Sequence, residues 1–194
     1  MKNLTPIHSR RRQTSRPSYF KAAILTLAIL VMQVPLLTFA GGADTEVPWE
    51  SFTATSLTYE KVDSSVLLGQ PTLLIITPSK AAADSTKAWT NALEKAMEGK
   101  KLRIRAVLTI NLPFFMSEAD AVGRAREVVP ERYYDQTWIL DSQIMEEALD
   151  ISTESKLAVI LILDASGTII ARVHGQLTDL RLAVIVRAVD LMTK

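Results

Sequence analysis

Short apolar runs alternate with amphipathic segments along most of the chain. Thr72 to Ile76 and Leu157 to Leu163 are apolar runs bounded by turn residues, which predicts strands buried on both faces. Leu102 to Ile110 alternates apolar with more polar positions, which predicts a strand with a more polar second face. Two further strands are expected at Ser56 to Val62 and at Trp138 to Asp141.

Apolar positions at helical spacing predict helices between and after these strands. The expected helices are Ala81 to Met97, Ser117 to Val129, Ile144 to Leu149 and Thr178 to Met192. In the last one, five side chains are expected to face the sheet: Leu182, Ile185, Val186, Val189 and Leu191.

The turn Asp164-Ala165-Ser166-Gly167 predicts a hairpin that returns the chain into a strand at Thr168 to Val173. The expected order is therefore β-α-β-α-β-α-β-β-α. Alternating units followed by a hairpin predict an α/β fold with a mixed sheet, whose early strands are parallel and whose last pair is antiparallel.

The first 40 residues have the pattern of a targeting segment. Six basic residues and no acidic ones precede or open an apolar stretch from Ala22 to Leu37, and Thr38-Phe39-Ala40 offers small residues for a signal peptidase. We expect a signal peptide cleaved after Ala40, a polar approach segment at 41–65 and one domain at 66–194. The alternative is an uncleaved anchor at 22–40, through which alone the chain would contact a membrane. Either reading predicts an exported domain, periplasmic or held at the inner membrane.

The net charge of +1 for the whole sequence differs from that of the part after the leader. All 21 acidic residues follow position 40 and six of the 22 basic residues precede it, so residues 41–194 carry a net charge of −5. This charge gives no reason to expect nucleic acid as a partner, because its phosphates are bound by Lys and Arg. The sequence contains no cysteine, which excludes disulfides and thiol chemistry.

The element order and the strand, Asp164 to Gly167 turn, strand, His174-Gly175 and capped helix resemble the C-terminal half of thioredoxin-fold proteins of the peroxiredoxin and periplasmic thioredoxin-like type. Ile110-Asn111, the strand at Trp138 to Asp141 and Ala158 to Gly167 are most similar to the uncharacterised periplasmic YtfJ-type group. The resemblance implies a three-layer α/β/α fold with a mixed central sheet and a C-terminal β-hairpin plus helix.

The chain departs from these proteins at their redox site. The redox cysteines of the family would fall between Pro78 and Asp84, where no residue can replace a thiolate. The cis-proline of the family would fall at Ala158, and a cis peptide is costly before alanine. The resemblance therefore implies the fold without the chemistry.

The candidate surface for a partner or ligand consists of Pro78, Ser79, Lys80, Asp84, Phe114, Phe115 and Ala158. Ser79-Lys80 at a helix start is either an anion site or an ordinary cap beside a solvated lysine. Phe114-Phe115 is either an exposed partner patch or a staple over the following helix, and Tyr133-Tyr134 has the same two readings.

No catalytic residue, metal site or cofactor is assigned. His174, the only histidine after the leader, is expected at the surface, and Asp164 is explained by its turn. The main hypothesis is a redox-inactive binding or scaffold domain that recognises another envelope protein. The alternatives are an enzyme or small-anion binder using the helix start with Asp84 or Asp141, and a membrane-anchored assembly subunit.

Overall fold

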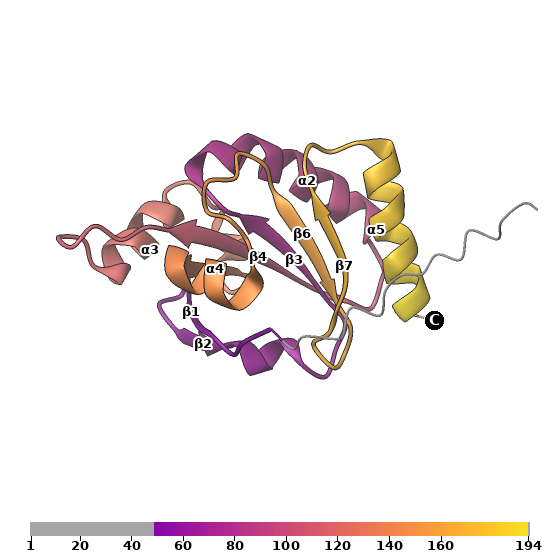
Figure 1. Ribbon diagram of the computed structural model, residues 1–194, viewed down its shortest axis with the longest axis horizontal. Helices are drawn as coiled ribbons and strands as arrows, with labels where there is room; N and C mark the ends of the chain where they lie inside the picture. The colour runs from indigo at the N-terminus through magenta and orange to yellow at the C-terminus, as the bar shows by residue number, and fades with distance from the viewer. Residues whose placement is uncertain (1–48, 194) are drawn as a thin grey trace, which may run out of the picture. The chain divides into compact units, whose positions relative to one another are not determined.

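The computed structural model describes residues 49–193, which fold around one mixed sheet (Figure 1). The strand order across the sheet is β2-β1-β5-β4-β3-β6-β7. The strands are β1 (Thr53–Ser56), β2 (Lys61–Asp63), β3 (Thr72–Thr77), β4 (Arg103–Ile110), β5 (Thr137–Asp141), β6 (Val159–Leu163) and β7 (Ile169–His174).

The directions of the strands confirm the expected mixed sheet. β3, β4 and β5 are parallel to one another, whereas β6 is antiparallel to both β3 and β7. Leu74 lies opposite Leu161, so the two strongest apolar runs are neighbours in the middle of the sheet. Both strands are buried along their whole length, as their uninterrupted apolar composition requires.

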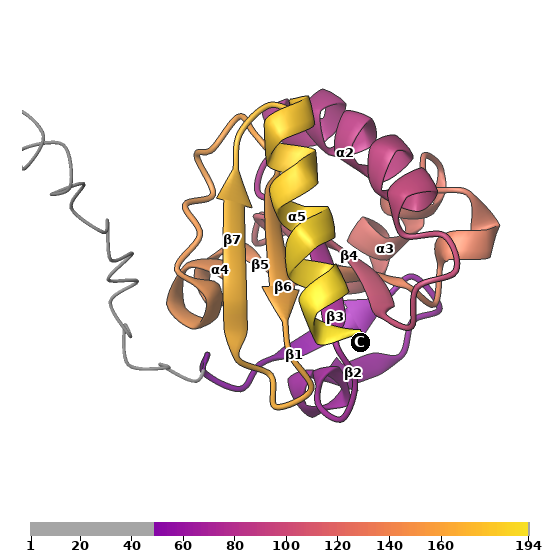
Figure 2. The same cartoon turned by 90° about the vertical axis from the view of Figure 1, so that its right-hand side faces the viewer.

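Helices cover both faces, which makes the three-layer α/β/α arrangement. The helices are α2 (Ala83–Ala96), α3 (Glu118–Arg126), α4 (Ser142–Leu149) and α5 (Asp179–Met192), and the short 3₁₀ turns are η1 (Ser64–Leu67), η2 (Lys80–Ala82) and η3 (Glu131–Tyr133). Figure 2 shows α2 and α5 side by side over one face. Figure 1 shows α4 over the other face.

Each face of the sheet has its own core. Trp89 and Leu93 of α2 and Ile185 of α5 pack on Leu73 and other residues of one face. Met145 and Leu149 of α4 pack with Trp138 on the opposite face. A third, smaller core under α3 joins Val122 to Ile139. The helix positions therefore follow from which apolar stripe each helix buries.

Side-chain caps start α3 and α5 where the sequence predicts them, whereas α4 begins at Ser142, two residues before the expected start. The Ser117 hydroxyl accepts a hydrogen bond from the Asp120 N–H, and the Asp120 carboxylate accepts one from the Ser117 N–H, so the two form a capping box. Thr178 caps α5 by accepting a hydrogen bond from the Arg181 N–H, and Asp141 caps α4 by accepting one from the Gln143 N–H, each without the reciprocal bond.

The expected strand from Ser56 to Val62 is wrong. The structure has a hairpin there, with a turn between β1 and β2 in which Tyr59 has a positive φ of 69°. Leu57 ends β1 by turning into the core under α3, where it is fully buried. Two strands of the sheet, the edge strand β2 and its neighbour β1, thus come from the segment expected to be a polar approach.

One further expectation fails. Leu191 of α5 is 67% exposed and does not face the sheet. The face of β4 that carries Arg103, Arg105 and Thr109 is the more polar one, as expected, and it is partly covered. On that face Val107 is fully buried, and Arg105 lies half-buried with its guanidinium carbon 5.8 Å from the Trp138 ring centroid.

The expected signal peptide or anchor lies outside the described residues. Within residues 49–193 no helix has the length and apolar character that crossing a membrane requires.

Candidate functional site

The carboxyl ends of β3, β4 and β5 meet at one end of the sheet, because these strands are parallel. This end holds the β3–α2 junction at Pro78 to Lys80 and the β4–α3 loop with Phe114 and Phe115. We call it the carboxyl pole. The sequence places candidate residues on separate segments, and the parallel sheet brings these segments to one end of the molecule.

Hydrogen bonds close the β3–α2 junction onto the loop before β6. The Ser79 hydroxyl donates to the carbonyl of Ser155 at 2.6 Å, and the N–H of Ala158 donates to the Ser85 hydroxyl at 3.2 Å. The two hydroxyls thus hydrogen-bond to the backbone of the facing loop, Ser79 as donor and Ser85 as acceptor.

Ala158 and Pro78 are buried, so the expectation that they contribute to an accessible surface is wrong. Ala158 lies immediately before β6 and packs in the core with residues of α2 and α5. The peptide bond before it is trans, as are all peptide bonds of residues 49–193. Both side chains pack in the interior and are not accessible to a partner.

Lys80 and Asp84 are exposed at the start of α2. The N-cap of α2 is Ala82, which has no capping side chain, and Asp84 lies in the first turn. Asp84 already supplies the negative charge that a helix start favours and would repel a bound anion. Because the Ser79 hydroxyl is also engaged, the geometry does not favour an anion site here.

Ser155 also contacts His174, a pairing that spacing along the sequence gives no means of predicting. The Ser155 hydroxyl lies 2.8 Å from Nε2 of His174 and accepts a hydrogen bond from the N–H of Leu157. The histidine is exposed, as expected. It fixes the loop before β6 against the end of β7.

Phe114 and Phe115 form the most exposed apolar feature at the carboxyl pole. Phe114 is fully exposed, Phe115 is 73% exposed, and their rings meet edge to face with centroids 5.4 Å apart. They lie in the loop that projects beside α3 (Figure 1). Of the two readings, the structure selects exposure, because Met116 instead packs into the core under α3.

A shallow hollow of about 360 Å³ adjoins the Phe114–Phe115 loop. Phe115, Met116 and Gly123 line it, together with the charged side chains Asp120 and Arg124 and with Ala119 and Glu127. The loop and the hollow together present an apolar projection next to a mixed-charge depression. Tyr134, by contrast, folds down onto the core under α3 and donates its hydroxyl hydrogen bond to the Arg126 carbonyl at 2.9 Å.

Charge interactions hold α3, and hence the loop, against the β1–β2 hairpin. The Glu118 carboxylate accepts hydrogen bonds from the Lys61 ammonium and the Thr55 hydroxyl. The hydrogen bond from Lys61, followed by that from Thr55, lowers the pKa of Glu118 below its ordinary value. The loop is therefore presented from a fixed helix start.

Asp141 and Asp164, the two strand-end carboxylates, serve local structure. Asp141 caps α4 through the N–H of Gln143, and Asp164 accepts hydrogen bonds from Ser166 and Thr168 in the hairpin turn. No group of three or more His, Cys, Asp or Glu side chains within the described part of the chain could hold a metal ion.

Neither the protein-family models nor the curated proteins contain a match to this chain. Solved structures do resemble it. The thioredoxin domain of a thiol-disulfide oxidoreductase from Bacteroides vulgatus has a TM-score of 0.53 at 18% identity, covering 77% of this chain and 97% of that one.

Two further similar structures are a lipoprotein and a protein with copper bound. A SCO1/SenC family lipoprotein from Bacillus anthracis has a TM-score of 0.53 at 12% identity, over 78% of this chain and 99% of that one. Copper-bound ScoI from Arabidopsis thaliana has a TM-score of 0.52 at 16% identity, over 74% and 99%. At these identities the similarity concerns the backbone alone, and it shows that the chain has a thioredoxin-like fold.

Proposed function

We propose that this chain is an exported, redox-inactive thioredoxin-like domain that binds another envelope protein through the Phe114–Phe115 loop. The observation that carries the proposal is the exposure of two adjacent phenylalanine rings at the carboxyl pole. Contiguous exposed apolar groups mark interaction sites, whereas singly scattered apolar residues are normal on a protein surface. We also propose that, among thioredoxin-like proteins, the chain is related to the YtfJ-type group.

The chemistry of the junction supports a binding role over a redox one. The chain has no cysteine, and the Ser79 and Ser85 hydroxyls are engaged with the backbone of the facing loop. Thiol exchange requires a thiolate, which no side chain of this junction supplies. In this proposal the thioredoxin-like fold serves as a scaffold, and the Phe114–Phe115 loop beside the junction contacts the partner.

Export is supported by the basic and apolar leader and by the names of similar structures. One of the similar structures is named as a lipoprotein and another as a member of the Sco family of cytochrome c oxidase assembly proteins. A membrane-anchored assembly subunit would present the same loop, and N-terminal sequencing of the mature chain separates the two forms.

The partner should offer an apolar pocket to Phe114 and complementary charges to the hollow beside it. Arg124 and Glu127 at the rim of the hollow select for paired opposite charges on the partner. The two rings supply the affinity, because truncating an anchoring aromatic residue commonly costs about 2 kcal/mol or more of binding free energy.

The test places a photo-crosslinking amino acid at Phe114 in cells that express the chain and identifies the captured protein by mass spectrometry. The purified partner is then titrated with the wild type and with F114A/F115A. We expect affinity to fall about 30-fold or more, which corresponds to about 2 kcal/mol.

The matched control is L180A/V184A, which removes two exposed apolar side chains from α5. It should leave the affinity unchanged. Equal affinity of the wild type and F114A/F115A for the captured partner would refute the proposed site. Thiol-exchange or peroxide-reducing turnover by the purified protein would refute the redox-inactive assignment.

A further inference from the structure

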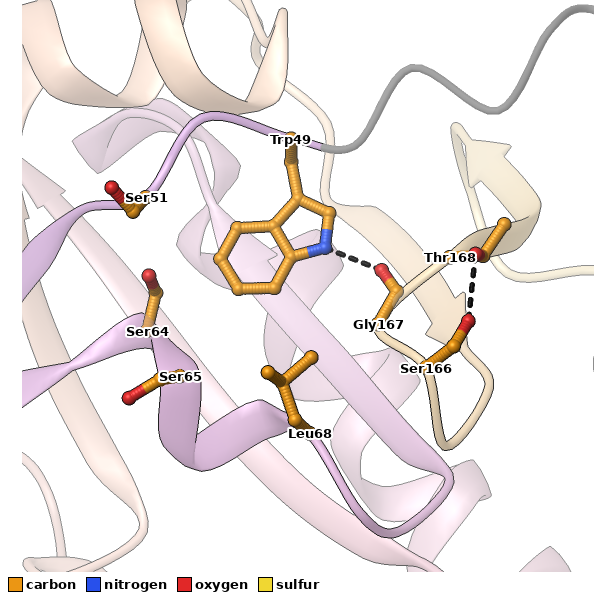
Figure 3. Close-up of a pocket in the computed structure, with 8 residues that line it drawn as sticks. All are labelled: Trp49, Ser51, Ser64, Ser65, Leu68, Ser166, Gly167 and Thr168. Carbon is orange, nitrogen blue, oxygen red and sulfur yellow. Dashed lines mark hydrogen bonds between the residues drawn. The ribbon is translucent and has the colours of Figure 1, made fainter.

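A second hollow, of about 400 Å³, lies at the end of the sheet opposite the carboxyl pole. β6 runs antiparallel to β3, so the β6–β7 turn lies near the beginning of β3, far from the β3–α2 junction. Trp49, the η1 turn and the β6–β7 turn surround this hollow (Figure 3). We call it the tryptophan pocket.

The lining of the tryptophan pocket carries hydroxyl groups and no charge. Trp49 and Leu68 supply apolar walls, Gly167 supplies backbone, and the remaining five lining residues bear hydroxyls: Ser51, Ser64, Ser65, Ser166 and Thr168. A charged ligand would lose hydration there without meeting an opposite charge in the lining. The pocket therefore suits a neutral ligand with many hydrogen-bonding groups.

The hydroxyls of the β6–β7 turn face the pocket as acceptors. Ser166 donates its proton to the Asp164 carboxylate at 2.6 Å. The Ser166 and Thr168 oxygens are 2.8 Å apart, and because the Ser166 proton is already used, Thr168 donates to Ser166. Thr168 is left with lone pairs only, so a ligand on this wall must donate.

The opposite wall can donate. The Ser64 oxygen accepts the N–H of Phe52 at 2.9 Å, and its own proton has no acceptor among the described residues. The Ser51 hydroxyl makes no hydrogen bond within residues 49–193. In Figure 3, Ser51 and Ser64 lie on the other side of the indole from Thr168. A ligand that spans the pocket therefore accepts on one side and donates on the other.

The Trp49 indole is held in place between these walls. Its N–H donates to the carbonyl of Gly167, and the ring lies beside Gly167, where an added Cβ would be in van der Waals contact with Nε1 at 3.4 Å. Because the N–H is used internally, the ring surface is what the indole offers a ligand. A wall fixed in this way loses little conformational freedom on binding.

From this arrangement we propose that the tryptophan pocket binds a neutral saccharide. Sugar hydroxyls both donate and accept, the C–H faces of a sugar ring are apolar enough to lie on an indole, and the molecule carries no charge. This site is independent of the Phe114–Phe115 loop, which lies at the other end of the sheet, so either assignment can fail without the other.

The test is a titration of the ¹⁵N-labelled protein with maltotriose, with the N-acetylglucosamine trimer and with glucose 6-phosphate. The signals followed are the Trp49 indole N–H and the backbone amides of residues 164–168. We expect saturable shifts of these signals with at least one of the two neutral saccharides and weaker binding of the phosphate ester.

Two variants test the pocket itself. T168V keeps the shape of the side chain and removes one acceptor, which should weaken binding by about threefold to tenfold, the value of one neutral hydrogen bond. S51A should weaken binding by a similar factor from the opposite wall. The control T153V makes the same substitution in the loop between α4 and β6 and should not affect binding.

Three results would overturn the proposal: no saturable shift with either neutral saccharide, an unchanged dissociation constant in both T168V and S51A, or tighter binding of glucose 6-phosphate than of the neutral sugars. W49F provides a second check, since it keeps an aromatic ring and removes the hydrogen bond to Gly167. Its fold is verified by circular dichroism before titration, and its binding should be weakened as well.

Discussion

The indole nitrogen of Trp89 donates a buried hydrogen bond of 2.8 Å to the carbonyl oxygen of Gly175. This contact ties the middle of α2 to the turn that leads from β7 into α5. Because α2 and α5 cover the same face of the sheet, the bond connects α2 to the segment that leads into α5, and the Trp89 ring packs in the core beneath both helices. A buried carbonyl that loses its donor costs more than the bond itself contributes.

We therefore expect W89F to lower the free energy of unfolding beyond the effect of reduced packing. W138F is the control, because it makes the same change in the core of the opposite face, and the Trp138 indole donates no hydrogen bond within the described residues. Urea denaturation should show W89F less stable than W138F by about 1–3 kcal/mol. Equal losses would mean that the bond to Gly175 contributes nothing.

Replacing Gly167 by alanine should destabilise the β6–β7 turn through two effects. Its φ is +88°, and an added Cβ would lie 2.6 Å from Cδ2 of Leu68. G99A is the matched control, because Gly99 has a φ of +76° and nothing within 4 Å of an added Cβ. Both should lose about 1 kcal/mol from backbone strain.

G167A should lose more than G99A, because the Leu68 side chain must shift as well. Thermal unfolding of the two variants measures the difference. If both melt at the same temperature, the close packing of Leu68 against Gly167 is not a constraint on the fold.

Removing the rings of the Phe114–Phe115 loop should not destabilise the fold. Both side chains are largely exposed, so F114S/F115S should change the free energy of unfolding by less than about 0.5 kcal/mol per substitution. The binding of a hydrophobic dye such as ANS should decrease. A large loss of stability would show that the rings are packed in solution.

Stability should decrease in acid, in part because of Asp164. Hydrogen bonds, first from the Ser166 hydroxyl, lower the pKa of Asp164 below its ordinary value of 3.8. A lowered folded pKa gives stability that is present above the ordinary value and is lost as pH falls through the folded value.

Urea denaturation between pH 7 and pH 2 tests this expectation. D164N should be less stable than the wild type at pH 7, and the difference should shrink toward pH 2. S166A retains the carboxylate and should flatten the pH dependence only in part. A difference between D164N and the wild type that stays constant with pH would exclude the Asp164 carboxylate as its source.

Much of the fold follows from interactions between residues close in the sequence. The apolar run of β3, the Asp164 to Gly167 hairpin and the capping box at Ser117 are each encoded within a few positions. The absence of cysteine is also visible from the sequence and removes thiol chemistry whatever the fold. These features are predictable because the physics that produces them is local.

Other features depend on partners that are distant in the sequence. Leu57 leaves the expected strand because Val122 and Ile139 provide a core for it. The exposure of Phe114 and of Leu191 depends on which neighbours are already packed. A periodic pattern indicates which face of an element is apolar. Whether a side chain on that face is buried depends on whether a neighbouring element covers it.

The tryptophan pocket is the clearest case of a feature that only the tertiary structure decides. Trp49 and Gly167 are 118 positions apart, and the hydroxyl residues around them come from three segments. Serine and threonine have no pattern in the sequence that marks a site. The antiparallel pairing of β6 with β3 brings them together, and the order of proton donation from Thr168 through Ser166 to Asp164 exists only once that turn has formed.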